Sequence, residues 1–148
     1  SQKVSRIFYA EGGDGMRFVM GSRAISPGNA GEPDDGGCED PTIVRGGGSY
    51  TAFYSGYERE RERSQMLQAV GPNLFALGKA GEVLPAGAFE NPKEAAVIAT
   101  RDGYRLFLEG VIDGASRIGA ADAKTLAGPW QPAASPGRTR IRDAAAFR

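Results

Sequence analysis

The sequence reads Ile43-Val44 and then Tyr50-Thr51-Ala52-Phe53-Tyr54-Ser55-Gly56, and this pattern recurs without gaps 54 residues later. The second copy reads Val97-Ile98, then Tyr104-Arg105-Leu106-Phe107-Leu108-Glu109-Gly110. In each copy a short apolar strand leads through a turn into a second strand. The turns, Gly46-Gly47-Gly48-Ser49 and Arg101-Asp102-Gly103, contain the glycine and aspartate that hairpin turns favour. The sequence therefore predicts two similar β-hairpins.

Both hairpins continue into further matching segments. A third strand is predicted over 66–70 in the first copy and over 118–122 in the second, where the preceding loop is two residues shorter. A closing strand carries Leu77 in one copy and Trp130 in the other. Each unit thus has four strands and about fifty residues, which is the size of a propeller blade.

A partial earlier copy of this unit opens the chain. The segments 7–11 and 18–20, joined by the turn Gly13-Asp14-Gly15, match the third and fourth strands of a blade. The prediction is an all-β fold, a partial β-propeller of about two and a half four-stranded blades within residues 1–135. The alternative is an ordinary β-sandwich with two similar hairpins. The predicted parts are a half blade at 4–30, blades at 38–87 and 93–134, and an unassigned tail at 136–148.

A propeller needs about four to eight blades to close around its axis. Two and a half blades leave sheet edges unpaired, and such edges invite further pairing. The sequence therefore predicts a fragment of a longer protein, a homo-oligomer (dimer) or assembly with a second half-propeller chain, or an open stack of sheets.

Composition narrows the possible chemistry. The 148 residues include 22 glycines and 9 prolines, which suit short strands and tight turns. Lysine plus arginine equals aspartate plus glutamate, at 18 each, so no overall field favours nucleic acid or a membrane surface. A neutral small-molecule carbohydrate fits such a surface. No stretch is long and apolar enough to span a membrane and no signal peptide is recognised, so we expect a cytoplasmic protein.

Histidine is absent and Cys38 is the single cysteine. A disulfide within the chain, a zinc site and histidine-based catalysis are therefore excluded, and no metal or other cofactor is predicted. Catalysis would have to use carboxylates, tyrosine, lysine or arginine. Beside two acidic residues, Cys38 is expected to be a poorly activated thiol.

One motif carries a family resemblance. Gly37-Cys38-Glu39-Asp40-Pro41-Thr42-Ile43, with Tyr50 and Phe53-Tyr54-Ser55-Gly56 after it, resembles the Gly-x-Glu-Asp-Pro-Arg signature of the five-bladed propeller family of β-mannoside phosphorylases and hydrolases. The segments 14–18, 91–96 and 119–130 are similar to further blades of that family. The resemblance runs over about 7–130, roughly half of the family's length, and implies that the propeller is five-bladed.

The resemblance implies that Asp40 is the general acid, at the mouth of the central axis, and that Lys93 binds sugar at the same axis. We expect Pro41 to start a strand and so direct Glu39 and Asp40 out of the sheet. The alternative is that this acidic pair only caps the strand. Glu39 and Glu94 complete the predicted catalytic set, and the remaining predicted substrate-binding residues are Glu109, Arg117 and Tyr54. Tyr57 is a further aromatic residue that could stack on a sugar.

Thr42 stands where the family's phosphorylases carry arginine, a residue suited to holding phosphate. The prediction is therefore a glycoside hydrolase-like protein acting on β-mannosides or related sugars, with hydrolysis favoured over phosphorolysis. The alternative is a non-catalytic carbohydrate-binding or structural half-propeller. The alternating run 58–63 is interpreted as a solvated hairpin tip, because neighbouring opposite charges cancel.

Overall fold

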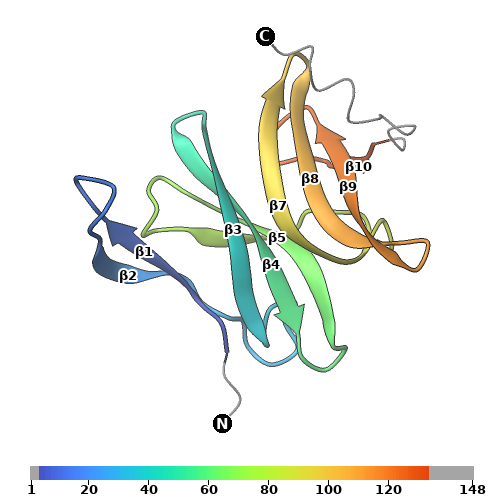
Figure 1. Cartoon of the computed structure of the whole chain (residues 1–148), viewed down its shortest axis with the longest axis horizontal. Coiled ribbons are helices and arrows are strands. Elements are labelled where there is room, and N and C mark those ends of the chain that lie inside the picture. Colours follow the sequence, from blue (N-terminus) through green and yellow to red (C-terminus); the bar gives the residue numbers. More distant parts are fainter. Residues whose placement is uncertain (1–3, 134–148) are drawn as a thin grey trace.

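The computed structural model describes residues 4–133 as three antiparallel sheets without a helix (Figure 1). The predicted tail, 136–148, lies outside the described residues. The first sheet contains β1 (Ile7–Glu11) and β2 (Val19–Ile25). The second sheet contains β3 (Gly37–Gly46), β4 (Ser49–Glu58), β5 (Arg63–Gly71) and β6 (Gly78–Glu82). The third sheet contains β7 (Glu90–Thr100), β8 (Gly103–Ile112), β9 (Ala115–Ala123) and β10 (Gln131–Pro132).

The two four-stranded sheets repeat each other in register, as the sequence predicts. Phe53 on β4 lies opposite Gln68 on β5, and Phe107 on β8 lies opposite Ala120 on β9. The shorter loop of the second copy is the two-residue turn 113–114, in place of 59–62 in the first copy. Each sheet is a meander in which sequential strands pair, which is the arrangement of a propeller blade.

The closing strands and the half blade differ in detail from the prediction. Leu77 and Trp130 do not lie in closing strands but directly precede β6 and β10. The strand β2 continues to Ile25, beyond the predicted 18–20 segment, because its last residue is buried in the core. The half blade is thus a two-stranded sheet that ends at Ile25.

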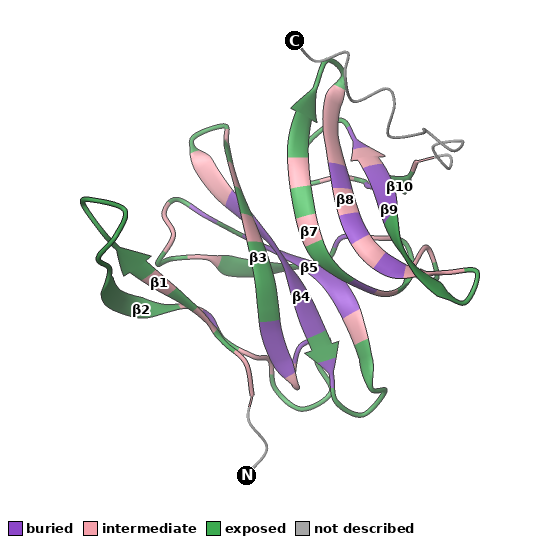
Figure 2. Ribbon diagram, viewed as in Figure 1, coloured by how far each residue is buried: buried purple, intermediate pink, exposed green. Residues whose placement is uncertain are grey.

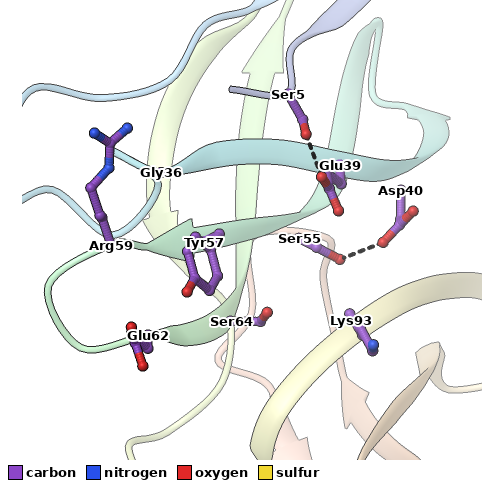
Figure 3. A pocket seen from close by; sticks show the side chains of 10 residues that line it. All are labelled: Ser5, Gly36, Glu39, Asp40, Ser55, Tyr57, Arg59, Glu62, Ser64 and Lys93. Atoms are coloured by element: carbon purple, nitrogen blue, oxygen red, sulfur yellow. Dashed lines mark hydrogen bonds between the residues drawn. The ribbon is translucent and has the colours of Figure 1, made fainter. Parts of the chain in front are cut away.

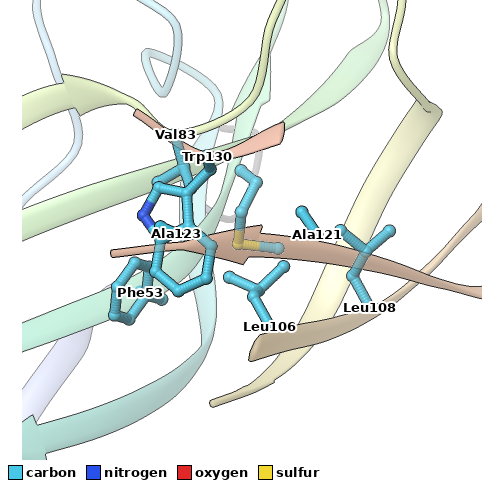
Figure 4. Packing of buried hydrophobic residues seen from close by; sticks show 8 residues of the cluster. Phe53, Val83, Leu106, Leu108, Ala121, Ala123 and Trp130 are labelled. Carbon is cyan, nitrogen blue, oxygen red and sulfur yellow. The ribbon is translucent and has the colours of Figure 1, made fainter. Parts of the chain in front are cut away.

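The middle sheet is buried on both faces, so its central strand reads as a continuous run of buried residues (Figure 2). On one face Phe53 packs against the third sheet, in a core that also holds Leu106, Leu108 and Trp130. The rings of Phe53 and Trp130 meet edge to face, with centroids 5.4 Å apart (Figure 4). The other face packs against the first sheet. Three sheets that follow one another in chain order, with the middle one covered twice, do not form a two-sheet sandwich, so the sandwich alternative is wrong.

The glycines repeated near the end of each hairpin, Gly56 and Gly110, lie in close packing, which requires glycine at position 56 and leaves little room at position 110. A Cβ added to Gly56 would lie 2.4 Å from a Leu67 methyl group and 2.9 Å from the Cβ of Asp34. A Cβ on Gly110 would meet Phe89 at 3.3 Å. In both blades a residue from the segment entering the sheet crosses over this glycine. The repeat therefore preserves space for the connection between blades.

Asp34 is the buried polar centre of the second core cluster. Its side chain is 2% exposed, and it accepts hydrogen bonds from the Tyr54 hydroxyl at 3.0 Å and the Cys38 thiol at 3.3 Å. The backbone N–H of Gly28 donates to it at 3.0 Å, and Lys79 Nζ lies 2.7 Å from Oδ2. Because every donor comes from a different element, Asp34 ties the segment before β3 to the middle sheet.

Burial and the neighbouring Asp34 carboxylate raise the pKa of the Cys38 thiol to about 12. The folded protein is therefore expected not to react with a thiolate-specific disulfide reagent at pH 8, because the thiolate is the reactive form. One thiol per chain should react after denaturation in guanidinium. Rapid labelling of the native protein at pH 8 would contradict this buried, protonated thiol.

Among residues 4–133, no helix is long and apolar enough to cross a membrane.

Candidate functional site

The candidate site lies where the first strands of two neighbouring blades, β3 and β7, contact each other. Both strands carry a β-bulge at equivalent positions. The register shifts between Glu39 and Thr42 on β3 and between Lys93 and Ala96 on β7. At these bulges Asp40 and Glu94 adopt left-handed backbone conformations, with φ of 50° and 53°. Bulges at such positions redirect side chains, and residues held in the left-handed region concentrate at functional sites.

The prediction that Pro41 starts a strand is wrong. We expected Pro41 to start a strand, but β3 begins at Gly37 and Pro41 lies inside it. Proline lacks the N–H needed for a regular ladder, so it is accommodated where the pairing is interrupted. The left-handed turn at Asp40, rather than a strand start, therefore sets the direction of the acidic pair.

Glu39, Asp40 and Lys93 line one cavity of about 440 Å³ between the two blades (Figure 3). Lys93 comes from β7, on the opposite wall from the two carboxylates of β3. Tyr57, from the end of β4, adds an aromatic ring. The cavity thus combines acidic, basic, hydroxyl and aromatic groups; its remaining lining residues are Ser5, Gly36, Ser55, Arg59, Glu62 and Ser64.

Ser55 connects the two bulges. Its Oγ donates a hydrogen bond to Asp40 Oδ2 at 3.3 Å and accepts one from the backbone N–H of Glu94 at 3.3 Å. Ser55 is 5% exposed, so these contacts are sheltered from water. Glu39 in turn accepts a hydrogen bond from the Ser5 hydroxyl. Ser55 therefore links the Asp40 carboxylate to the backbone of the neighbouring blade at Glu94.

The other predicted site residues do not line this cavity. Glu94 contributes its backbone N–H to a hydrogen bond with Ser55, and its exposed side chain is not among the lining residues. Glu109 pairs with Lys93 across the strands and accepts a hydrogen bond from Ser116. Arg117 is exposed and donates to the Ile112 carbonyl oxygen at 3.3 Å. None of these three side chains lines the cavity.

Tyr54 must be removed from the predicted substrate-binding set. It is 1% exposed, and its hydroxyl is bound to Asp34 in the core. Successive residues of a strand face opposite sides of the sheet. Tyr54 therefore faces the first sheet, whereas Tyr57, three residues later and 40% exposed, reaches the cavity.

The alternating run 58–63 forms a hairpin tip, as predicted, but some of its side chains are buried or line the cavity. Glu58 is 5% exposed and forms ion pairs with Arg61 and Arg63, at 3.1 and 2.8 Å. Arg59 and Glu62 line the cavity. The alternating charges did not indicate that Arg59 and Glu62 line a cavity, because a sequence pattern does not show which side of a turn faces a neighbouring blade.

The position of Arg59 is fixed by the preceding loop. Its backbone N–H donates to Asp35 Oδ1 at 2.8 Å, and its guanidinium donates to the Asp35 carbonyl oxygen at 3.4 Å. Hydrogen bonds from the backbone N–H groups of Arg59 and Gly31 lower the pKa of the Asp35 carboxyl. Asp35 is thus expected to stay ionised and to hold the hairpin tip beside the cavity.

Among residues 4–133, no group of three or more histidine, cysteine, aspartate or glutamate side chains is placed to hold a metal ion. The cavity contains three carboxylates, on Glu39, Asp40 and Glu62, and two cationic side chains, Arg59 and Lys93. Such a set can donate and accept protons and form many hydrogen bonds with hydroxyl groups.

The fold is shared with solved structures of glycoside-processing enzymes. One is a family 117 glycoside hydrolase from the marine bacterium Zobellia galactanivorans, with a TM-score of 0.76 and 18% identity over 86% of this chain and 41% of that one. A second belongs to the GH130 family of mannoside phosphorylases, a family described as containing glycoside hydrolases that target β-1,2 mannosidic linkages in Candida mannan. It has a TM-score of 0.69 and 22% identity over 88% of this chain and 40% of that one.

A third is a β-1,2-mannobiose phosphorylase from Listeria innocua, described in complex with β-1,2-mannobiose, with a TM-score of 0.67 and 16% identity over 89% of this chain and 38% of that one. No protein-family model matches the sequence, and no curated protein does. The chain therefore has the fold of a partial β-propeller, which it shares with these glycoside-processing enzymes. It spans about two fifths of the length of the solved structures that it matches.

Proposed function

We propose that this chain is glycoside hydrolase-like and acts on β-mannosides or related sugars, with Asp40 as the general acid. The observation that carries the proposal is the meeting of Asp40 and Lys93, from neighbouring blades, in one cavity of about 440 Å³. This volume is in the range of about 300–1,000 Å³ that small-molecule sites occupy.

The residues of the cavity supply the groups that glycoside hydrolysis needs. Asp40 would donate a proton toward the leaving glycosidic oxygen, directly or through a sugar hydroxyl. A second carboxylate is then needed to activate water in an inverting reaction. Glu39 and Glu62 are the candidates inside the cavity. Lys93 would orient the sugar by donating hydrogen bonds to its hydroxyl groups.

The assay is incubation of the whole chain with β-1,2-mannobiose, with and without inorganic phosphate. We expect free mannose in both conditions, because Thr42 replaces the arginine of the resembling phosphorylases. Mannose 1-phosphate formed only with phosphate would overturn hydrolysis in favour of phosphorolysis. The absence of both products would overturn the catalytic proposal.

A second candidate function is carbohydrate binding without turnover. It is favoured by the placement of Glu94 and Glu109, since neither predicted carboxylate lines the cavity. Binding of β-1,2-mannobiose in calorimetry with no product after prolonged incubation would select this function.

We also propose that the exposed apolar residues of the first sheet and its turn are covered by a second copy of the chain or by a second half-propeller chain. Met16, Phe18, Val19 and Met20 are 63–85% exposed, and Phe8 is 49% exposed. Several large apolar side chains exposed within so short a part of the chain are typical of an interaction surface. Light scattering should give at least twice the monomer mass, and Val19→Glu should lower it. A monomer at all concentrations would contradict self-association.

A further inference from the structure

Ser55, on the central strand β4, lies between the two β-bulges and contacts both of them. Figure 3 shows its hydroxyl group directed toward the Asp40 carboxylate. Ser55 is 5% exposed although it lines the cavity. A hydroxyl group that is buried between two hydrogen-bonding partners has a defined orientation. Ser55 is therefore placed to act on Asp40.

The pairing of strands does not by itself hold Asp40 in place. The register of β3 with β4 passes from Glu39 directly to Thr42, so Asp40 and Pro41 lie in the bulge. Pro41 has no N–H to donate, and Asp40 has φ of 50°, a conformation that is costly for a residue with a Cβ. The hydrogen bond from Ser55 thus supplies a fixed contact where the ladder is interrupted.

The second bulge frees a donor in the neighbouring blade. The register of β7 with β8 passes from Lys93 to Ala96, so Glu94 lies outside it. The backbone N–H of Glu94 donates to Ser55 Oγ at 3.3 Å. Because an N–H can only donate, the single hydroxyl hydrogen of Ser55 is left for Asp40 Oδ2. The neighbouring blade therefore fixes the direction in which Ser55 donates.

The repeat shows that the strand itself does not require serine at this position. Ser55 pairs with Glu39 across β4 and β3, and Glu109, 54 residues later, pairs with Lys93 across β8 and β7. The same place in the next hairpin thus accepts a long charged side chain. The contacts across to the neighbouring blade, rather than the strand, distinguish position 55.

The hydrogen bond gives the two carboxyl oxygens of Asp40 different roles. Oδ2 accepts from Ser55, whereas within residues 4–133 no protein group donates to Oδ1. The transferable proton then belongs on Oδ1. As this proton moves to the leaving oxygen and the glycosidic C–O bond breaks, negative charge develops on the carboxylate and the hydrogen bond from Ser55 strengthens. An interaction that is stronger in the transition state raises kcat rather than lowering KM.

We infer that Ser55 is a positioning residue for Asp40: it holds Oδ2, leaves Oδ1 to carry the proton, and makes this orientation depend on the neighbouring blade through the Glu94 N–H. This inference rests on the proposed function.

The test compares turnover of β-1,2-mannobiose by the whole chain and by Ser55→Ala, Ser55→Val and Ser55→Thr. We expect Ser55→Ala and Ser55→Val to lower kcat about tenfold with KM within about twofold, the scale of one hydrogen bond to a charged group. Ser55→Thr should keep kcat within about threefold, because threonine retains the hydroxyl and shares the branched shape of valine. The matched control is Ser22→Ala, since Ser22 is exposed on β2 and does not line the cavity.

Two further measurements separate positioning from a purely structural role. With an activated aryl β-mannoside the departing oxygen needs little protonation, so Ser55→Ala should lose much less activity than with mannobiose. In the Asp40→Asn background, Ser55→Ala should cause no further loss, because the acid through which Ser55 acts is already absent. A structural defect would lower turnover of both substrates equally and would add to the effect of Asp40→Asn.

The outcomes also separate this inference from the proposed function. Mannobiose turnover by Ser55→Ala within about twofold of the parent, or by Ser55→Thr no better than by Ser55→Val, would overturn the positioning role and leave the mannoside site standing. Additive effects of Ser55→Ala and Asp40→Asn would overturn it as well. If the parent chain releases no mannose from mannobiose, the proposed function and the role of Ser55 fail together.

Discussion

Replacing Asp40 by asparagine is expected to lower kcat for β-1,2-mannobiose by about 10²–10⁴-fold, the usual contribution of a general acid. Asparagine has nearly the same shape and cannot donate a carboxylic proton. It tolerates the left-handed conformation that Asp40 adopts, with φ of 50°, and it can still accept the hydrogen bond from Ser55. The variant should therefore keep its fold and its KM while losing turnover.

A leaving group of low pKa distinguishes this role from a structural one. With an activated aryl β-mannoside the departing oxygen needs little protonation, so the Asp40→Asn variant should lose much less activity. Asp102→Asn, in the exposed β7–β8 turn, is the matched control and should behave as the parent protein. Turnover of mannobiose within about tenfold of the parent by Asp40→Asn would refute the acid role.

Replacing Asp34 by alanine is expected to lower the free energy of unfolding by about 2–4 kcal/mol, because two buried donors each lose their hydrogen-bond partner. The substitution removes the acceptor of the Tyr54 hydroxyl and of the Cys38 thiol inside the core, and it removes the partner of the Lys79 ammonium, whose side chain is 35% exposed. Unpaired buried polar groups bear the full cost of losing their contact with water. Guanidinium unfolding followed by the fluorescence of Trp130, the single tryptophan and 2% exposed, measures the loss.

The Lys79→Met variant separates the contribution of the Lys79–Asp34 ion pair from that of the hydrogen bonds to Asp34. This variant should lose less stability than Asp34→Ala, because Asp34 still accepts hydrogen bonds from Gly28, Cys38 and Tyr54. A loss of less than about 1 kcal/mol for Asp34→Ala would mean that the network contributes no more than an ordinary hydrogen bond.

The repeat made the blades predictable. The hairpins and their turns follow from local chemistry, since alternating strands and glycine turns act over a few residues. The shared register of 53 with 68 and 107 with 120 follows from that repeat. Local chemistry did not indicate that the middle sheet is covered on both faces, which is why Tyr54 was predicted to bind substrate although it is in the core.

The candidate site was predictable only in part. Glu39, Asp40 and Lys93 belong to the cavity, and a motif and its repeat were enough to select them. Arg59 and Glu62 were missed because they lie in a charge run whose composition is that of a solvated turn. Glu94 does not line the cavity, because at the bulge its backbone N–H, rather than its carboxylate, contacts Ser55.

The order of residues by itself determined that this chain builds repeated four-stranded sheets and brings an acidic pair to the beginning of one of them, because hydrogen-bonded hairpins depend on neighbours in sequence. Only the tertiary structure decided which side chains share a cavity. That choice depends on the angle at which one blade packs on the next and on the bulges at Asp40 and Glu94, where contacts between residues distant in the chain hold the backbone in a conformation that local preference disfavours.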